Sequence, residues 1–139
     1  MIQNGVDFRE IIPKVETLPQ RFRNKGFFTA RVGKIFHYMV PGQIEADGYD
    51  DPPSWEVVIN PIGIDKDVDG QVEMIDPGTP ALGAILSWLS IESADHEHTD
   101  GKIALEAVKL LQENHPQKTG KPFFIGVIHI SANDHTLFF

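Results

Sequence analysis

A lysine and a histidine three residues apart, Lys34 and His37, form the pair of side chains in this sequence best suited to hold an anion. They follow a short apolar run, Phe27–Val32, and a glycine, Gly33. A lysine ammonium is a compact charge with three donors, and an imidazole can donate a hydrogen bond or protonate a leaving oxygen near neutral pH. Two interpretations are open on spacing alone. Either both groups bind a tetrahedral oxyanion, or Lys34 is a solvated surface charge and His37 a hydrogen-bonded loop residue.

A helix before this pair must position it. Thr17 is suited to the N-cap, Pro19 to the first turn and Gly26 to the C-terminal stop. Leu18 and Phe22 are four residues apart, and we expect them to share a buried face. The preceding segment, residues 1 to 16, is expected to be a connection whose apolar anchors are Ile11, Ile12 and Val15.

Phe27–Val32 is predicted to be a strand, so helix, glycine and strand together indicate one unit of a layered α/β sheet. Residues three apart on a flat strand face opposite ways. Lys34 and His37 can therefore converge only if the backbone turns directly after Gly33.

The second half of the chain predicts another helix and strand. Thr99 can cap the helix, Asp100 favours its positive end and Pro116 closes it. Its apolar stripe is formed by Ile103, Ala104, Ala107, Leu110 and Leu111. Pro122–Ile130 is predicted to be a strand buried on both faces, and Ala81–Ile91 a buried helix or strand.

Two stretches, Leu18–Thr29 and Val32–His37, resemble the second signature of the sulfatases, in which a helix, a glycine-containing turn and a strand lead into Gly-Lys-x-x-His. The spacing is similar to the iduronate-2-sulfatase branch, and the resemblance extends from about Leu18 to Val127. Further segments that look like this branch are Val40–Ile44, Asp50–Trp55, Asn60–Pro61, Leu86–Leu89, Thr99–Gly101 and Lys121–Phe124.

The resemblance implies an α/β fold, a partial alkaline-phosphatase/sulfatase-like layered sheet with flanking helices, with residues 1–139 as a single partial domain. It implies a sulfuric ester hydrolase that acts, in full-length form, on sulfated polysaccharide, with Lys34 and His37 lining the sulfate pocket. The family's later Arg-Pro-His motif is absent, and His135 is a candidate for its histidine, with His129 as a second candidate.

The resemblance also implies a formylglycine nucleophile and calcium. The chain contains no cysteine and no Ser-x-Pro-x-Arg, and the family's calcium ligands are not identifiable in it, so we expect little or no activity from this chain alone. Full-length relatives are expected to be periplasmic, secreted or lysosomal, although residues 1–10 do not read as a signal peptide.

Composition limits the partners. The chain has 139 residues and a net charge of −8, which argues against non-specific binding to nucleic acid or to an anionic membrane. An anionic substrate would need a local basic pocket, to which Lys34 with Arg31 or Arg23 could contribute. The absence of cysteine excludes disulfides and thiolate metal sites.

The prolines, glycines and aspartates concentrated between about residues 38 and 80 predict a long loop without regular elements. Asp65, Asp67 and Asp69 resemble part of a calcium loop, but the twelfth position is Asp76 where glutamate is required, and a solvated acidic turn is the alternative.

Two other groups of polar residues have a chemical and a structural interpretation. His96 and His98 have the spacing of a zinc pair in an extended segment, or belong to a polar linker. Asp50 and Asp51 are either an acid–base pair or part of a stiff turn before two prolines. Two competing functions remain open: a non-enzymatic sulfate- or anion-binding module, and a phosphatase or phosphodiesterase of the same superfamily.

Overall fold

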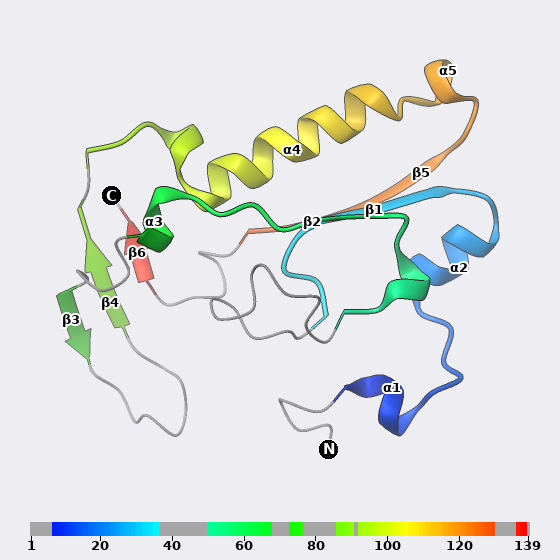
Figure 1. The fold of residues 1–139 in the computed structure, drawn as a ribbon, viewed down its shortest axis with the longest axis horizontal. Helices are drawn as coiled ribbons and strands as arrows, with labels where there is room; N and C mark the ends of the chain where they lie inside the picture. Colours follow the sequence, from blue (N-terminus) through cyan, green and yellow to red (C-terminus); the bar gives the residue numbers. More distant parts are fainter. Residues whose placement is uncertain are drawn as a thin grey trace.

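The computed structural model describes residues 7–36, 50–67, 73–76, 86–90, 92–129 and 136–138 (Figure 1). His37, which carries half of the predicted anion site, and His135 lie outside the described residues. Among the described residues, no helix is long and apolar enough to cross a bilayer.

The main sheet has three parallel strands in the order β2-β1-β5, with β1 (Phe28–Gly33) between β2 (Val57–Ile59) and β5 (Phe123–Ile128). Ala30 is paired with Val57 on one side and with Ile125 on the other. The mixed α/β class is confirmed, and both predicted strands form. The expectation that the second strand is buried on both faces is wrong, because β5 is at the end of the strand order and its residues are half-buried or exposed. The remaining strands, β3 (Glu73–Asp76), β4 (Leu86–Leu89) and β6 (Thr136–Phe138), form a second sheet in the order β3-β4-β6.

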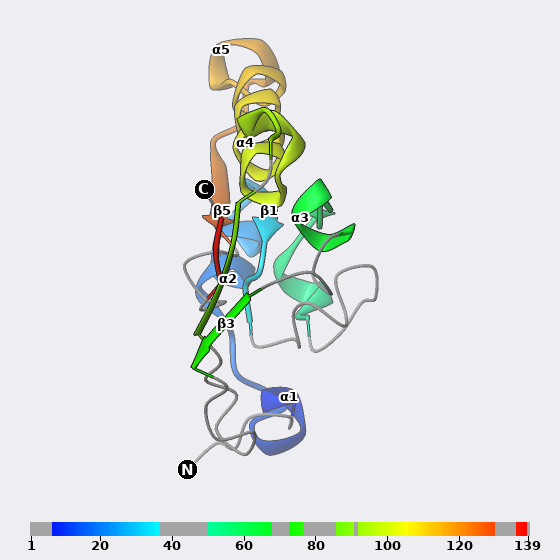
Figure 2. The ribbon, with the colours of Figure 1, turned by 90° about the vertical axis from the view of Figure 1, so that its left-hand side faces the viewer.

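Helix α4 (Thr99–Glu113) covers one face of the main sheet, as Figures 1 and 2 show. Ile103 and Leu110 of α4 form the core with Ala30 and Val32 of β1. Ile103, Ala107 and Leu110 of the predicted stripe are therefore buried, whereas Ala104 and Leu111 are exposed. After α4 the chain forms a short helix, α5 (Pro116–Thr119), and enters β5.

Helix α2 (Leu18–Asn24) forms where its end signals predicted. Thr17 accepts a hydrogen bond from the Gln20 backbone N–H, and Gly26 adopts φ +82° directly after the helix. Phe22 stacks on Phe124 of β5 with ring centroids 4.8 Å apart. The prediction for Leu18 is wrong, because its side chain is 64% exposed.

The N-terminal segment is held differently from the prediction. Ile11, Ile12 and Val15, the expected anchors, are all exposed. Helix α1 (Phe8–Ile11) instead contacts the rest of the chain through Phe8, which stacks on Phe36, and through Arg9. Its apolar residues are too few and too scattered to bury a face, so an aromatic ring and a charge hold it.

The loop expected from about residue 38 to residue 80 contains regular structure. In its described part lie a 3-10 helix, η1 (Pro52–Ser54), the sheet strand β2, a short helix α3 (Ile64–Asp67) and β3. Strand β2 has only three residues and is followed by Asn60-Pro61, so it lacks the periodic pattern that identifies longer strands. Pairing with β1 therefore holds β2 in an extended conformation that its local sequence does not specify.

Gly33 ends β1 with φ +81°, and a Cβ there would overlap the carbonyl oxygen of Ile128. Gly26 has nearly the same φ but has open space where a Cβ would stand. We expect Gly26→Ala to cost about 1–2 kcal/mol for the left-handed backbone alone. Gly33→Ala should cost about 1–3 kcal/mol more, because the neighbouring strand must move. Urea denaturation of both variants measures the difference, and equal losses would contradict this account.

Candidate anion site at the carboxyl end of the sheet

The carboxyl ends of three parallel strands meet at one edge of the main sheet, which is where ligands bind in open α/β sheets. Lys34 follows β1, Asn60 follows β2 and His129 follows β5. The first turn of α4 lies at the same edge, since Asp100 Oδ1 is 3.7 Å from His129 Nδ1. The topology therefore gathers a cation, an amide and a titratable ring at one edge.

Lys34 leaves β1 directly after the positive-φ Gly33, and Phe36 also has a positive φ of 56°. The backbone thus turns out of the strand at the point where convergence of Lys34 and His37 requires a turn. Lys34 is half-buried, and its ammonium has no hydrogen-bond or ion-pair partner within the described part of the chain. His37 lies outside that part, so the pairing itself stays a prediction.

Arg31, considered above as a second cation for an anion, is buried, and its guanidinium binds other groups of the protein. Its Nε and Nη2 donate to Asp50 Oδ2 at 2.9 and 2.7 Å, and its Nη1 donates to the Gly33 carbonyl at 2.6 Å and to Asn60 Oδ1 at 2.7 Å. The guanidinium therefore links the ends of β1 and β2. Arg23, the other candidate, donates to the carbonyls of Pro52 and Pro53.

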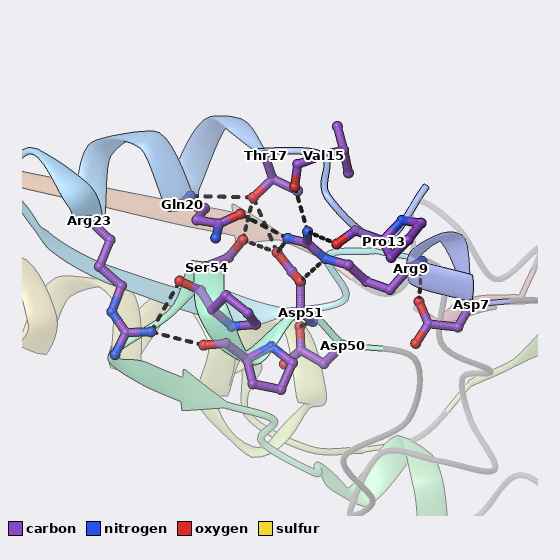
Figure 3. Close-up of polar contacts among 12 residues, drawn as sticks. Asp7, Arg9, Pro13, Val15, Thr17, Gln20, Arg23, Asp50, Asp51 and Ser54 are labelled. Carbon is purple, nitrogen blue, oxygen red and sulfur yellow. Dashed lines mark hydrogen bonds and ion pairs between the residues drawn. The ribbon is translucent and has the colours of Figure 1, made fainter. Parts of the chain in front are cut away.

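A second arginine, Arg9, is bound to the neighbouring carboxylate (Figure 3). Its Nε and Nη2 donate to the two oxygens of Asp51 at 2.8 and 2.9 Å, and the same carboxylate accepts from the hydroxyls of Thr17 and Ser54. Arg9 also donates to the Val15 carbonyl. Asp51 is fully buried and joins α1, the start of α2 and η1.

Asp50 and Asp51 are therefore not an acid–base pair. Asp50 accepts from Arg31 and Asp51 from Arg9, and the Asp51 N–H donates to Asp50 Oδ1 at 2.8 Å. The alternative interpretation, a stiff turn, agrees with the 3-10 helix that follows. Each carboxylate is neutralised by its own arginine.

The pKa of Asp51 reflects this environment. Burial would raise the pKa, but hydrogen bonds from Arg9 and Ser54, the charge of Arg9 and the hydroxyl of Thr17 outweigh it, so the pKa lies below the ordinary value for aspartate. The same contact raises the pKa of Arg9. The pair is therefore ionised at neutral pH.

Aromatic rings support the backbone beside Lys34. Phe36 stacks on Phe8 with centroids 5.3 Å apart, and Trp55 lies 6.2 Å from both Phe36 and Phe124. The rings thus hold Phe36, and the hydrogen bond from Arg31 holds Gly33, the residue directly before Lys34.

The two groups that resemble metal-binding motifs, Asp65–Asp69 and His96–His98, make other contacts within the described residues. Asp65 Oδ1 accepts from the N–H and the hydroxyl of Thr99, so Asp65 caps α4 and Thr99 is its first residue rather than its cap. His98 Nε2 lies 2.6 Å from Ser93 Oγ. Among the described residues, no group of three histidine or acidic side chains could hold a metal ion. Asp69 lies outside those residues.

A shallow pocket of about 330 Å³ lies between the segment after β2 and the start of α4. Its polar lining consists of Asp67, His96, Glu97 and Lys102, and the Lys102 ammonium donates to the Ile62 carbonyl at 2.6 Å. Lys34 does not line this pocket. The pocket and the candidate anion site are therefore separate features of the same sheet edge.

Sequence reasoning missed Arg9 and Asn60 as parts of this region. No local signal marks Arg9, because its partner is 42 residues away in the chain. The available signal for Asn60 was the proline that follows it, because this proline marks the end of a short strand that the sequence pattern does not reveal. Comparison of the chain with protein-family models, with curated proteins and with solved structures gave no match.

Proposed function

We propose that the chain carries the sulfate-binding part of a sulfuric ester hydrolase similar to iduronate-2-sulfatase, which in full-length form hydrolyses sulfate esters of sulfated polysaccharide. The observation that carries the proposal is the position of Lys34, at the carboxyl end of the central strand and directly after a glycine that turns the backbone. The resemblance of Leu18–Thr29 and Val32–His37 to the sulfatase signature supplies the reaction class.

The chemistry of the proposed site follows from its charges. The sulfur of a sulfate monoester is surrounded by negative oxygens, so fixed cations and hydrogen-bond donors lower the barrier to attack. Lys34 would bind one sulfate oxygen and His37 a second one or the leaving oxygen. Lys34 supplies the positive charge in this scheme, since Arg31 and Arg23 are bound to protein groups.

The nucleophile and the calcium ion of the family are not assigned to residues of this chain. Without them we expect the Lys34 site to bind an anion and not to turn it over. This expectation favours a sulfate- or anion-binding module as the second candidate function of the isolated chain. A Ser or Thr nucleophile in an adjoining segment would favour a phosphatase or phosphodiesterase instead.

Lys34→Ala should weaken binding of a sulfated oligosaccharide at least about tenfold, because a hydrogen bond to a charged group contributes about 1.5–3 kcal/mol. His37→Ala should have an effect of similar size. Isothermal titration calorimetry on the 139-residue chain measures both, with Lys109→Ala as the control for charge, since Lys109 is exposed on α4.

Two results would contradict parts of the proposal. Equal weakening by Lys34→Ala and Lys109→Ala would show non-specific attraction rather than a site. Hydrolysis of a sulfate ester by the purified chain, abolished by Lys34→Ala, would overturn the expected inactivity while supporting the site.

A further inference from the structure

Strand β5 is at an edge of the main sheet, and in the described part of the chain no strand pairs with its outer side. Its last two residues are apolar and exposed, Val127 by 39% and Ile128 by 37%. An edge with unpaired backbone N–H and C=O groups is a template for another strand.

An apolar stripe on α4 lies beside this edge. Asp100 of α4 reaches His129 at the end of β5, so the side of α4 that carries Asp100 is the β5 side. Ala104, Val108 and Leu111 follow Asp100 by four, eight and eleven residues and therefore share its side of the helix. All three are exposed.

The opposite side of α4 is identified in the same way. Lys102 reaches the carbonyl of Ile62 after β2, and Leu105, three residues later, shares that side. Figure 2 shows β5 and α3 beneath opposite sides of α4. Leu111 is 43% and Leu105 is 55% exposed, and their spacing of six residues sets them about 120° apart around the helix, so these two residues differ in side more than in exposure.

We propose that the β5 edge and the Ala104–Val108–Leu111 stripe form the contact between two copies of this chain, paired antiparallel through β5 about a two-fold axis normal to the sheet. A register centred on Ile125 places Phe123 opposite Val127 of the second copy, on the face that α4 covers. It places Phe124 opposite Gly126 on the other face. Large side chains thus face small ones, and the two sheets become one of six strands.

The spacing of the helices agrees with this pairing. Helix α4 contacts both β1 and β5, so we place its axis between these two strands, which as neighbours in a sheet are about 4.8 Å apart. The two-fold axis then sets the two α4 helices about 10 Å apart, at the distance where helices pack side by side. The stripe on each helix faces its counterpart.

Charge favours the antiparallel orientation. The exposed Lys121 precedes the amino end of β5. His129 follows its carboxyl end and contacts Asp100 of α4. In the proposed register Lys121 of one copy lies opposite His129 of the other and close to its Asp100 carboxylate. A parallel arrangement would place the two lysines together.

Sedimentation equilibrium of the 139-residue chain tests the proposal. We expect twice the 15.5 kDa monomer mass at tens of micromolar protein, a dissociation constant raised at least tenfold by Leu111→Glu, and no such change with Leu105→Glu. A monomeric wild-type chain, an open series of larger assemblies, or equal effects of the two glutamates would overturn it.

Hydrogen exchange keeps the test decisive if a variant is poorly folded. In the wild-type chain, alternate amides of β5 should become protected with increasing protein concentration, because they gain partners across the two-fold axis. Protection of β5 that is independent of concentration would also overturn the proposal.

Discussion

Replacement of Arg31 by methionine should lower the free energy of unfolding by about 3–5 kcal/mol, the usual cost of removing one partner of a buried ion pair. Methionine fills a similar volume but leaves the carboxylate of Asp50, which is 8% exposed, without its cation. It also removes the donors to Gly33 and Asn60 that join the ends of β1 and β2. Urea denaturation monitored by far-UV circular dichroism gives the change.

Arg21→Met is the matched control, since Arg21 forms an exposed pair with Glu16 and should cost less than about 1 kcal/mol. The double replacement Arg31→Met with Asp50→Asn should recover part of the loss, because the uncompensated charge is then removed. A loss below about 1 kcal/mol for Arg31→Met, or no recovery in the double variant, would show that the pair does not hold the strand ends.

Local sequence signals were sufficient to predict helix α2 and the buried face of helix α4. Thr17, Pro19 and Gly26 delimit α2, and the spacing of Ile103, Ala107 and Leu110 defines the buried face of α4. These features depend on residues within one or two turns of each other, so a pattern in the sequence determines them.

Contacts between distant residues could not be predicted in this way. In the sequence Arg31 is only a polar residue within an apolar strand, because its ion pair with Asp50 exists only in the folded chain. Strand β2 is too short to show a period. Arg9 is an ordinary surface arginine in the sequence, but Asp51 makes it the main anchor of α1. At the anion site, sequence supplies Lys34 and the turn after Gly33, whereas the use of Arg31 and Arg23 within the protein required the fold.

Replacement of Asp51 by asparagine should cost about 2–4 kcal/mol at neutral pH, because a neutral amide leaves the partly exposed guanidinium of Arg9 without its charged partner. It should also change the pH dependence of stability. The pKa of Asp51 is lowered in the folded state, so its contribution is fully present above the unfolded pKa of about 3.9 and is lost as pH falls through the folded value. Below that range the variant and the wild-type chain should approach each other in stability.

Glu56→Gln, at an exposed carboxylate beside η1, controls for the loss of one negative charge and should leave the difference between neutral and acid pH almost unchanged. Parallel curves for Asp51→Asn and wild type from pH 7 to about pH 2 would contradict the role of Asp51.

The acid effect should begin locally, because Asp51 joins α1 to the rest of the chain while the sheet core contains Ala30, Val32, Ile103 and Leu110. Protonation of Asp51 removes the charge that holds Arg9, leaving the Phe8–Phe36 stack and the Arg9 hydrogen bonds to Gln20 and Val15 as contacts of α1. Hydrogen exchange should therefore show the amides of Glu10 and Ile12 opening at a higher pH than those of β1. Simultaneous opening of α1 and β1 would mean that the N-terminal segment and the sheet unfold as one unit.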